Sequence, residues 1–518
     1  MPDDAAAHLH ARHEGTIESV TVDAAGVDRL KPNAIGLWGV IFVAVTGAAP
    51  ISAMLFNVPF AVGFGTGLGT PGAFLFATAI LTIFSVGYVS MARKIRAAGG
   101  FYSFISHGLG RELGMATGIC GAIAYSLFEV SLLGGFAYFA NSNFNDWFGW
   151  DIPWPIFALG AAILISAFCW FDVELSVRVL GIALVGEIVI LTLFDVLVIG
   201  QNGSTNGLAW SSLNPLNAFK GATGLGADGK AVAGAAGVGL FLAFWSWVGF
   251  EATPNYAEES RDPVRNVPRA TLISVIGLGI GYTITSFAFV SAFPKGKLVA
   301  ISQGSDPPFF TAMRQFGSHG LATIMQVLIL TGSFACAMAF HNVAMRYFYA
   351  MGREGILPAA LGKTHPTHKS PYVASVFQTI VAVAVVVAWG VASGFGKPFD
   401  TAYVRVYTMM AVQGVVWILA IQALCALAII VYHRKHHATE NPLVTVVCPV
   451  IAIVGQVYAI ILLFQNISVL AGTITYASQI WWIAVLGVAA SLAYALYLKT
   501  ANREKYDLIG RMIDEGPA

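Results

Sequence analysis

Charged residues are scarce in this chain. Only 11% of its 518 residues are Asp, Glu, Lys or Arg, whereas 57% are hydrophobic, and the mean hydropathy is +0.72. Soluble domains carry about 25% charged residues, so the composition excludes that class. No charged residue occurs between Trp38 and Ala92, although one membrane-spanning helix needs only about 20 apolar residues. The chain is therefore expected to cross a membrane many times.

Motifs that would indicate other protein classes are missing as well. HExxH and close groupings of His, Asp and Cys do not occur, so we expect no metal, no cofactor and no membrane enzyme. The sequence contains no repeated filter-like loops and no rings of charge, so it does not predict a channel. It also contains no basic tract that would predict binding to nucleic acid. The five cysteines lack CxxC spacing and are interpreted as packing residues. The polar N-terminus lacks the basic-then-apolar start of a cleaved signal peptide.

What the sequence does contain is a series of long apolar runs, in which hydropathy places twelve membrane spans. With the N-terminus inside the cell, the large majority of the 28 Lys and Arg residues fall in inner loops and tails. The positive-inside rule therefore predicts a multi-pass protein of the cell (plasma) membrane with both termini in the cytoplasm. We divide the chain into a cytoplasmic tail (1–35), a core of ten spans (36–435), two further spans (436–500) and a second cytoplasmic tail (501–518). The spans are expected near residues 36–63, 72–92, 113–141, 154–171, 179–200, 234–257, 270–293, 319–350, 372–392, 403–432, 443–466 and 479–498.

Two of the spans are interrupted at their middles by Gly, Pro and polar residues. One interruption lies in Ile41–Ser52 and the other in Phe244–Tyr256. A proline within a helix leaves backbone groups without partners, and lipid cannot satisfy them. Such backbone is tolerated where protein or a water-filled cavity surrounds it, which is where secondary transporters bind substrate. Because the broken spans stand five apart, they run in opposite directions, as a five-plus-five inverted repeat requires.

Three further segments carry a family resemblance. They are Ala97–Gly110 after the second span, Trp247–Glu251 with the loop Glu258–Ala270, and Arg346–Pro358 followed by a Ser-Pro pair. In this order they resemble the signatures of amino acid–polyamine–organocation permeases. The resemblance implies an all-α membrane protein with twelve transmembrane helices, a leucine-transporter-like inverted repeat, and substrate held between broken helices 1 and 6. Members of the family import or exchange amino acids, polyamines and related amines.

The resemblance also implies which residues contact the substrate. In the family, backbone N–H groups of an unwound triplet in helix 1 receive a substrate carboxylate at a positive helix end. Here Pro50 removes one donor, which leaves room for an amine substrate, although a carboxylate can still bind the N–H groups of Ile51 and Ser52. The resemblance implies that Trp245 faces the substrate side chain, where its indole face would favour binding of an ammonium or guanidinium group by about 1–2 kcal/mol. The alternative interpretation is that Trp245 packs between helices. The predicted substrate-binding residues are Thr46, Gly47, Ala48, Ala49, Pro50, Ile51, Ser52, Trp245, Ser246, Val248 and Phe250.

Ionisable residues within the spans are candidates for coupling transport to protons. Placing a charged side chain at membrane depth costs free energy, so such a residue is expected to have a function or a bonded partner. Glu251 lies beside the second break, whereas Glu187 and Glu129 stand in spans 5 and 3. His341 in span 8 has an unperturbed pKa suited to a proton relay. For each of these residues the alternative is a buried, hydrogen-bonded brace, and Asp195 near the outer end of span 5 is expected in solvent.

Charged residues on the inner side of the membrane are predicted to form an inner gate. Their ion pairs would break and re-form as the gate moves, and the alternative is a set of solvated helix ends. The predicted gate residues are Arg93, Glu258, Glu259, Arg265, Arg269 and Arg353.

Together these features predict a secondary active transporter, or permease, and no enzymatic activity. We expect it to move amino acids across the cytoplasmic membrane by alternating access, as a proton-coupled symporter or an exchanger. Its expected partners are a small-molecule substrate, the lipid bilayer and protons. Two alternatives stay open: an importer of polyamines or other organic amines, and a transporter-like membrane sensor that binds its ligand without flux.

Overall fold

The fold is almost entirely helical. The computed structural model describes residues 30–95, 99–171, 173–304, 306–392, 395, 399–436, 440–471 and 479–510. Within them, eleven helices are long and apolar enough to cross a membrane, and the shorter apolar helix α7 (Trp154–Trp170) is a twelfth. The predicted all-α fold with twelve membrane helices is thereby confirmed. The division into tails, core and last spans stays a prediction. Residues 1–29 and 511–518 of the tails, and Ala97 and Ala98 of the first signature, lie outside the described residues.

We number the membrane crossings as spans 1–12 in chain order. Span 1 comprises α1 (Leu37–Gly47), α2 (Pro50–Ser52), η1 (Ala53–Asn57), α3 (Val58–Phe60) and η2 (Ala61–Gly65), and span 6 comprises α9 (Ala236–Trp245) and η6 (Phe250–Tyr256). The continuous spans are 2 (α4, Thr70–Ala92), 3 (α6, Arg111–Phe148), 4 (α7), 5 (α8, Val173–Gly200), 7 (α10, Pro263–Ala292), 8 (α13, His319–Arg353), 9 (α14, Tyr372–Ala392) and 12 (α18, Ile480–Ala501). Span 10 comprises η8 (Phe399–Thr408) and α15 (Met409–Lys435), and span 11 comprises η9 (Leu443–Val447) and α16 (Cys448–Gln465). Both spans start with π-helical turns, which are η8 and η9.

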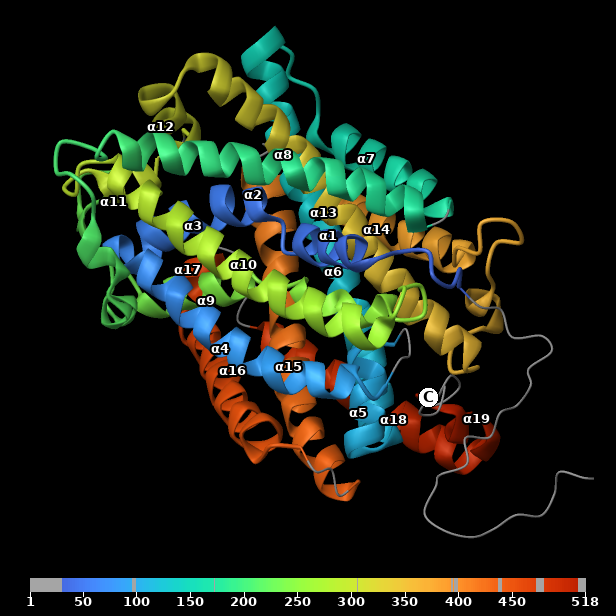
Figure 1. Cartoon of the computed structure of the whole chain (residues 1–518). Helices are drawn as coiled ribbons and strands as arrows, with labels where there is room; N and C mark the ends of the chain where they lie inside the picture. The colour runs from blue at the N-terminus through green and yellow to red at the C-terminus, as the bar shows by residue number, and fades with distance from the viewer. Residues whose placement is uncertain are drawn as a thin grey trace, which may run out of the picture.

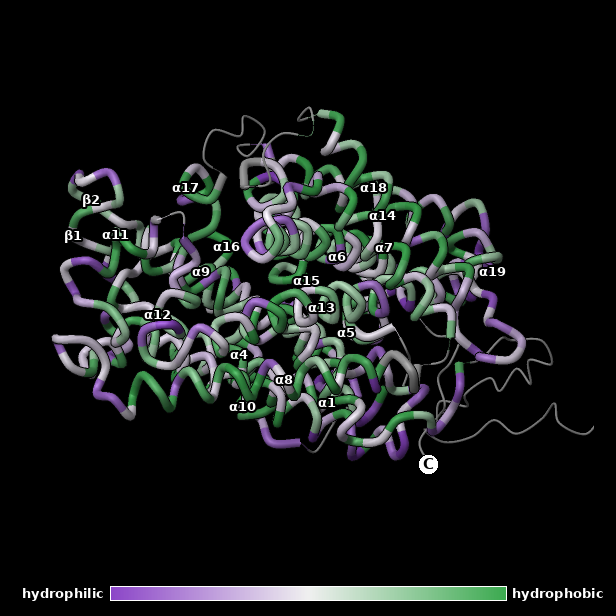
Figure 2. Tube along the Cα trace, turned by 90° about the horizontal axis from the view of Figure 1, so that it is seen from above, coloured by the Kyte–Doolittle hydropathy of each residue, from purple (hydrophilic) through white to green (hydrophobic). Residues whose placement is uncertain are grey.

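Short elements connect the spans. They are η3 (Gly67–Gly69), α5 (Phe101–Leu109), η4 (Trp210–Leu213), η5 (Pro215–Phe219), β1 (Thr223–Leu225), β2 (Ala231–Ala233), α11 (Leu298–Ser302), α12 (Pro308–Phe316), η7 (Ala359–Gly362), α17 (Ile467–Ala471) and α19 (Arg503–Leu508). Strands β1 and β2 pair antiparallel, with Thr223 opposite Ala233. Hydrophilic residues gather at opposite ends of the molecule, around β1 and β2 at one end and near α19 at the other, with hydrophobic helices between them (Figure 2).

Proline and glycine set several helix ends. Helices α4, α7 and α10 each carry a proline in the first turn, where the missing N–H costs no helical hydrogen bond. Helix α6 ends at Gly149, whose φ of 71° belongs to the left-handed region that glycine adopts without strain. The prolines of α4 and α7 lie close to the span starts expected from hydropathy, whereas α10 begins before its expected start at residue 270 and α6 continues beyond its expected end at residue 141.

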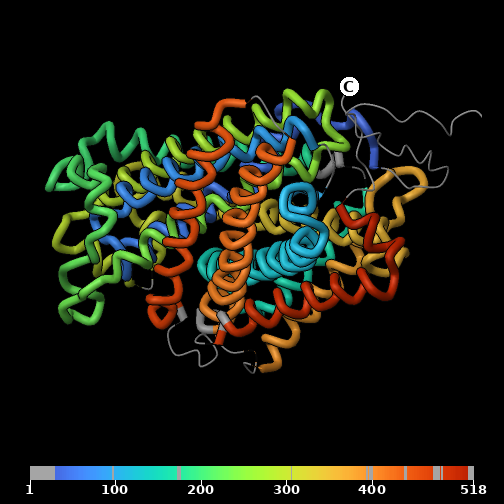
Figure 3. The backbone as a smooth tube through the Cα atoms, turned by 90° about the horizontal axis from the view of Figure 1, so that it is seen from below, coloured from blue at the N-terminus to red at the C-terminus, as the bar shows by residue number. Residues whose placement is uncertain are grey.

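The two broken spans lie within the bundle. Helix α1 packs between α8 and α10 (Figure 1), and it also contacts α13 and η6 of the second broken span. Helices α6 and α13 pack along one another and form a wall beside the breaks. Helix α18 lies at the edge of the molecule against α6 (Figure 3). The breaks are therefore surrounded by protein, as membrane-buried irregular backbone requires.

Candidate functional site

The break in span 1 lies between α1 and α2. Helix α1 ends at Gly47, and Ala49 adopts a φ of 45°, a left-handed conformation that is strained for any residue with a side chain. Pro50 then starts α2, where its fixed φ suits the first helical position. The sequence pattern of small residues followed by proline therefore unwinds the helix over two residues, Ala48 and Ala49.

The break in span 6 faces it directly. Helix α9 ends at Trp245, and η6 starts after Gly249, which has a φ of 119°. A Cβ atom at Gly249 would lie 2.4 Å from the carbonyl carbon of Gly47, so the two breaks touch backbone to backbone. Only glycine allows both this φ and this approach.

Two tyrosines satisfy carbonyl groups that the breaks expose. The Tyr282 hydroxyl in span 7 donates to the Ala48 carbonyl at 2.8 Å, and the Tyr88 hydroxyl in span 2 donates to the Glu251 carbonyl at 2.8 Å. Spans 2 and 7 are counterparts in the five-plus-five repeat, as are spans 1 and 6. Each half of the repeat thus supplies a donor to the break in the other half.

Removing either hydroxyl is expected to destabilise the protein. Tyr88→Phe or Tyr282→Phe leaves a buried carbonyl without its donor, which costs about 1–3 kcal/mol of unfolding free energy. Thermal unfolding of the purified protein in detergent measures the effect. Tyr497→Phe is the matched control, because that side chain is 61% exposed. Equal midpoints for all three variants would contradict this role.

Two carboxylates cap the backbone N–H groups of the breaks. In span 5, Glu187 Oε2 accepts from the Ile51 N–H at 3.1 Å. In span 6, Glu251 Oε2 accepts from the Gly249 N–H at 2.9 Å, and its Oε1 accepts from the Tyr125 hydroxyl at 3.0 Å. Both carboxyl groups are fully buried. One of the two N–H groups predicted to receive a substrate carboxylate is therefore bonded to the protein's own carboxylate.

A narrow cavity lies between the breaks. Its volume of about 30 Å³ holds one or two water molecules, so an amino acid needs the walls to move apart. The residues that line it are Gly47, Ala48, Ala49, Ser52, Ala53, Asn57, Phe128, Leu132, Trp245, Ser246, Val248, Cys336, Phe340 and Tyr407. Of the predicted substrate-binding residues, Thr46, Pro50, Ile51 and Phe250 lie outside this lining. Among the described residues that line the cavity, none is charged.

Aromatic and polar groups meet in the cavity wall at Tyr407. The rings of Trp245 and Tyr407 stack at 5.6 Å between centroids. Asn57 Nδ2 donates to Ser246 Oγ at 2.9 Å, and the Tyr407 hydroxyl donates to Asn57 Oδ1 at 3.5 Å, which joins spans 1, 6 and 10 in one polar corner. A hydroxyl pair, Ser52 with Ser333 at 3.2 Å, joins spans 1 and 8.

Sequence reasoning missed several lining residues. Asn57 is a polar residue within an apolar run, which was a usable signal. Phe128, Phe340 and Tyr407 come from spans 3, 8 and 10, where nothing in the sequence distinguishes cavity-facing aromatics from packing ones.

The remaining coupling candidates lie away from the cavity lining. Glu129 and His341 contact each other, with 3.0 Å between Oε1 and Nδ1. The expectation that Asp195 is solvated is wrong: the residue is only 8% exposed, and its Oδ2 accepts from the Thr285 hydroxyl at 2.9 Å. The packing of α10 on α8 covers this carboxylate, which hydropathy alone could not show.

Two ion pairs lie at the end of the molecule that the positive-inside rule predicts to face the cytoplasm. Glu258 Oε1 lies 3.0 Å from Arg353 Nη2, so these two predicted gate residues form an ion pair with each other. Glu259 pairs with Arg346, a residue that sequence reasoning placed only in a signature, at 2.6 Å between Oε2 and Nη2.

The other predicted gate residues are placed differently. Arg265 is exposed, and among the described residues its ion pair is with the neighbouring Asp262, at 3.7 Å. Arg93 and Arg269 are exposed and make no ion pair with any residue that the structure describes.

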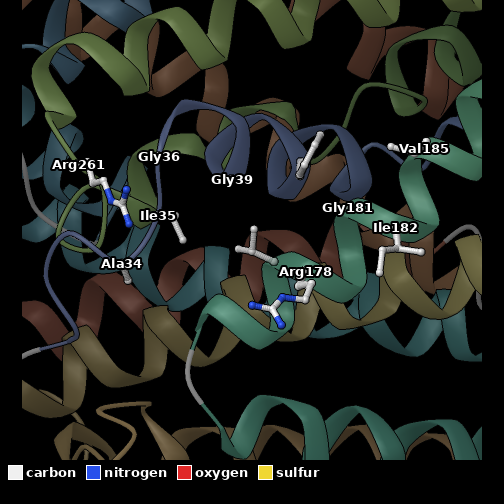
Figure 4. A pocket seen from close by; sticks show the side chains of 11 residues that line it. Ala34, Ile35, Gly36, Gly39, Arg178, Gly181, Ile182, Val185 and Arg261 are labelled. Carbon is white, nitrogen blue, oxygen red and sulfur yellow. The ribbon is translucent and has the colours of Figure 1, made fainter.

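A wider groove lies on the outside of spans 1 and 5. It has a volume of about 630 Å³, and Figure 4 shows Gly36, Gly39, Gly181 and Ile182 along it, with Arg261 near Gly36 and Arg178 between Arg261 and Gly181. The groove does not reach the breaks, so its size does not make it the substrate site.

Comparisons with known proteins show the family and the fold of the chain. The sequence profile of the family described as amino acid permease matches residues 35–490. The branched-chain amino acid permease BcaP of Bacillus subtilis is 24% identical over 334 residues, which cover 60% of this chain and 67% of that protein. The methylthioribose transporter of Bacillus subtilis is 25% identical over 441 residues, covering 82% of this chain and 85% of that protein. A crystal structure of a manganese transporter from Eremococcus coleocola matches with a TM-score of 0.59 and 11% identity, covering 94% of this chain and 99% of that one, which shows a shared fold.

Proposed function

The chain belongs to the amino acid permease family, and from this premise we propose that it is a secondary active transporter that carries amino acids across the cytoplasmic membrane. The touching breaks of spans 1 and 6, with the cavity between them, are the observation that carries the proposal. Substrate binds there as the stacked Trp245 and Tyr407 rings separate. The pairs Glu258–Arg353 and Glu259–Arg346 close the inner side and open when the substrate leaves towards the cytoplasm, where both termini lie.

The chemistry of the cavity favours an amino acid with an uncharged side chain. A polyamine carries several positive charges, and burying them requires carboxylates or other partners. The described lining offers hydroxyl, amide and aromatic groups but no carboxylate. Phe128, Leu132 and Phe340 suit an apolar side chain, whereas Ser52, Asn57 and Ser246 suit the polar ends of the substrate. An amino acid therefore fits these walls better than a polyamine.

Transport in proteoliposomes tests the proposal. We expect saturable uptake of labelled leucine but not of labelled spermidine, with labelled methylthioribose as a third probe. Trp245→Ala is expected to lower leucine uptake about tenfold, because losing an aromatic wall worth about 1–2 kcal/mol weakens binding by that order. Trp210→Ala, at an outer-loop position that is 66% exposed, is the matched control.

The possible results separate the alternatives. Uptake of spermidine alone would establish the amine importer instead. Leucine binding without flux in either direction would establish a sensor. Unchanged leucine uptake by Trp245→Ala would remove the cavity between the breaks as the substrate site.

A further inference from the structure

A buried network joins Glu129 of span 3 to His341 of span 8. Glu129 Oε1 lies 3.0 Å from His341 Nδ1, and both side chains are fully buried. Glu129 Oε2 accepts from Gln378 Nε2 at 2.6 Å, and Gln378 Oε1 accepts from the Ser126 hydroxyl at 2.7 Å. His341 Nε2 lies 2.9 Å from Ser375 Oγ. Every polar atom of the carboxyl group and of the imidazole ring therefore has a partner.

This network accepts two protonation states without moving a heavy atom. When the imidazole is neutral and donates from Nδ1 to Glu129, its Nε2 accepts from the Ser375 hydroxyl. When the imidazole carries a second proton, Nε2 donates to the same hydroxyl oxygen, because a hydroxyl group rotates to donate or accept. The hydroxyl partner at Nε2 therefore suits both protonation states.

The pair lies directly behind the cavity wall. The chain neighbours Phe128 and Phe340 line the cavity, and their rings stack at 4.9 Å between centroids. On the other side, Ser375 stands in the first turn of α14, which starts at Tyr372 on the side assigned to the cytoplasm. The pair thus stands between the substrate cavity and the inner end of span 9.

Among the described residues, no third charged group is bonded to the pair, whose other partners are neutral. The elements packed around the pair carry further titratable side chains: Arg111, Glu112, Cys120, Tyr125, Tyr138 and Asp146 on α6, His319, Cys336, Arg346, Tyr347, Tyr349 and Arg353 on α13, Cys169 on α7, Arg178, Glu187 and Asp195 on α8, Tyr372 on α14, Tyr403, Arg405 and Tyr407 on η8, and Cys425, Tyr432, His433, Arg434 and Lys435 on α15. The two least exposed charged residues of this set are bonded elsewhere, Arg346 to Glu259 and Glu187 to the Ile51 N–H. One proton more or less on the pair therefore changes the net charge of this region by one.

We propose that Glu129 and His341 together form the proton-binding site that couples transport to the proton gradient. The inference rests on the proposed transport function and names its coupling site. With the carboxylate ionised and the imidazole neutral, the pair carries a charge of −1. A proton taken from the outer water binds the imidazole or carboxylate and makes the pair neutral, and the same proton leaves to the cytoplasm after the substrate. An uncharged pair is the cheaper state to bury, so the loaded carrier crosses between its two conformations more readily than the unloaded one.

The test separates exchange from driven accumulation. Full-length wild type, Glu129→Gln and His341→Gln are reconstituted in proteoliposomes and supplied with labelled leucine, once in counterflow at equal pH and once under an inward proton gradient. In wild type we expect the gradient to raise leucine accumulation about tenfold, whereas in both variants it changes accumulation less than about twofold while counterflow persists. Thr379→Ala, on the same helix as Ser375, is the matched control that keeps the gradient response.

Other outcomes overturn one proposal or the other. Counterflow in wild type without any proton movement, measured with a trapped pH dye, overturns the coupling site but leaves the transport function standing. A gradient response in both variants also overturns the coupling site. If no probe is moved by wild type, the transport function itself fails.

Folding failure of the single variants does not remove the test. The double variant Glu129→Gln with His341→Gln places two amides that can bond to each other, and it should exchange leucine without a gradient response. Glu129→Asp keeps a titrating group on a shorter side chain and should shift the pH midpoint of driven uptake. An unshifted midpoint would count against the pair.

Discussion

Gly249→Ala is expected to abolish transport. Its φ of 119° is strained for alanine, and the added methyl group would lie 2.4 Å from the Gly47 carbonyl carbon and 2.7 Å from the Ala48 nitrogen. Neither contact is with a side chain that can turn away, so the backbones of the two breaks must separate. Strain and overpacking together cost roughly 2–5 kcal/mol, which lowers leucine counterflow by at least about thirtyfold.

A second glycine provides the control for this variant. Gly277 lies in span 7, and a Cβ there meets nothing within 4 Å. Gly277→Ala should therefore keep wild-type counterflow and gain up to about 1 kcal/mol of stability from its better helix propensity. If Gly249→Ala and Gly277→Ala transport leucine equally well, close contact of the breaks is not required for function.

Arg346→Met is expected to produce the largest loss of stability. The guanidinium group is 1% exposed, donates to Glu259 Oε2 at 2.6 and 3.1 Å, and lies 4.2 Å from the centre of the Tyr256 ring. Removing it takes the bound guanidinium group away from the buried Glu259 carboxylate, which costs about 3–5 kcal/mol of unfolding free energy. Thermal unfolding in detergent should show a large drop in midpoint, together with weak expression.

Two further variants show whether the lost partner causes this effect. Arg346→Met combined with Glu259→Met removes both charges, so much of the stability should return. Arg265→Met breaks only an exposed contact, whose worth is at most about 1 kcal/mol, and should leave the midpoint nearly unchanged. A double variant as unstable as the single one would mean that lost packing of the arginine stem, rather than unpaired charge, explains the loss.

The positions of the breaks could be predicted because their cause is local. Small residues before Pro50 mark the first unwound residues, Ala48 and Ala49, and Gly249 marks the second break. In span 6 the unwound residues precede Pro254, which lies inside η6. Hydropathy likewise predicts the number of spans, since each apolar run is long enough to cross the membrane once.

Partners across the bundle could not be predicted, because the sequence does not report how each helix is rotated. Glu187 was recognised as costly, yet nothing in span 5 indicated that it caps the Ile51 N–H. Likewise, the sequence presents Glu129 and His341 as separate candidates, although they bond to each other. Arg346 lies 87 positions from Glu259, and only the packed structure shows that this arginine, rather than Arg265 or Arg269, holds the end of span 6.

The exchange of donors between the two halves has a consequence for how the chain is made. When the ribosome has delivered only the first five spans to the membrane, the Ala48 carbonyl lacks Tyr282 and the Gly47 carbonyl lacks the Cys336 thiol, because both donors are still to be synthesised. The Ile51 N–H, in contrast, finds Glu187 within the same half. A nascent first half therefore holds unsatisfied backbone in the bilayer until spans 7 and 8 insert, so the break of span 1 reaches its native form only late in biosynthesis.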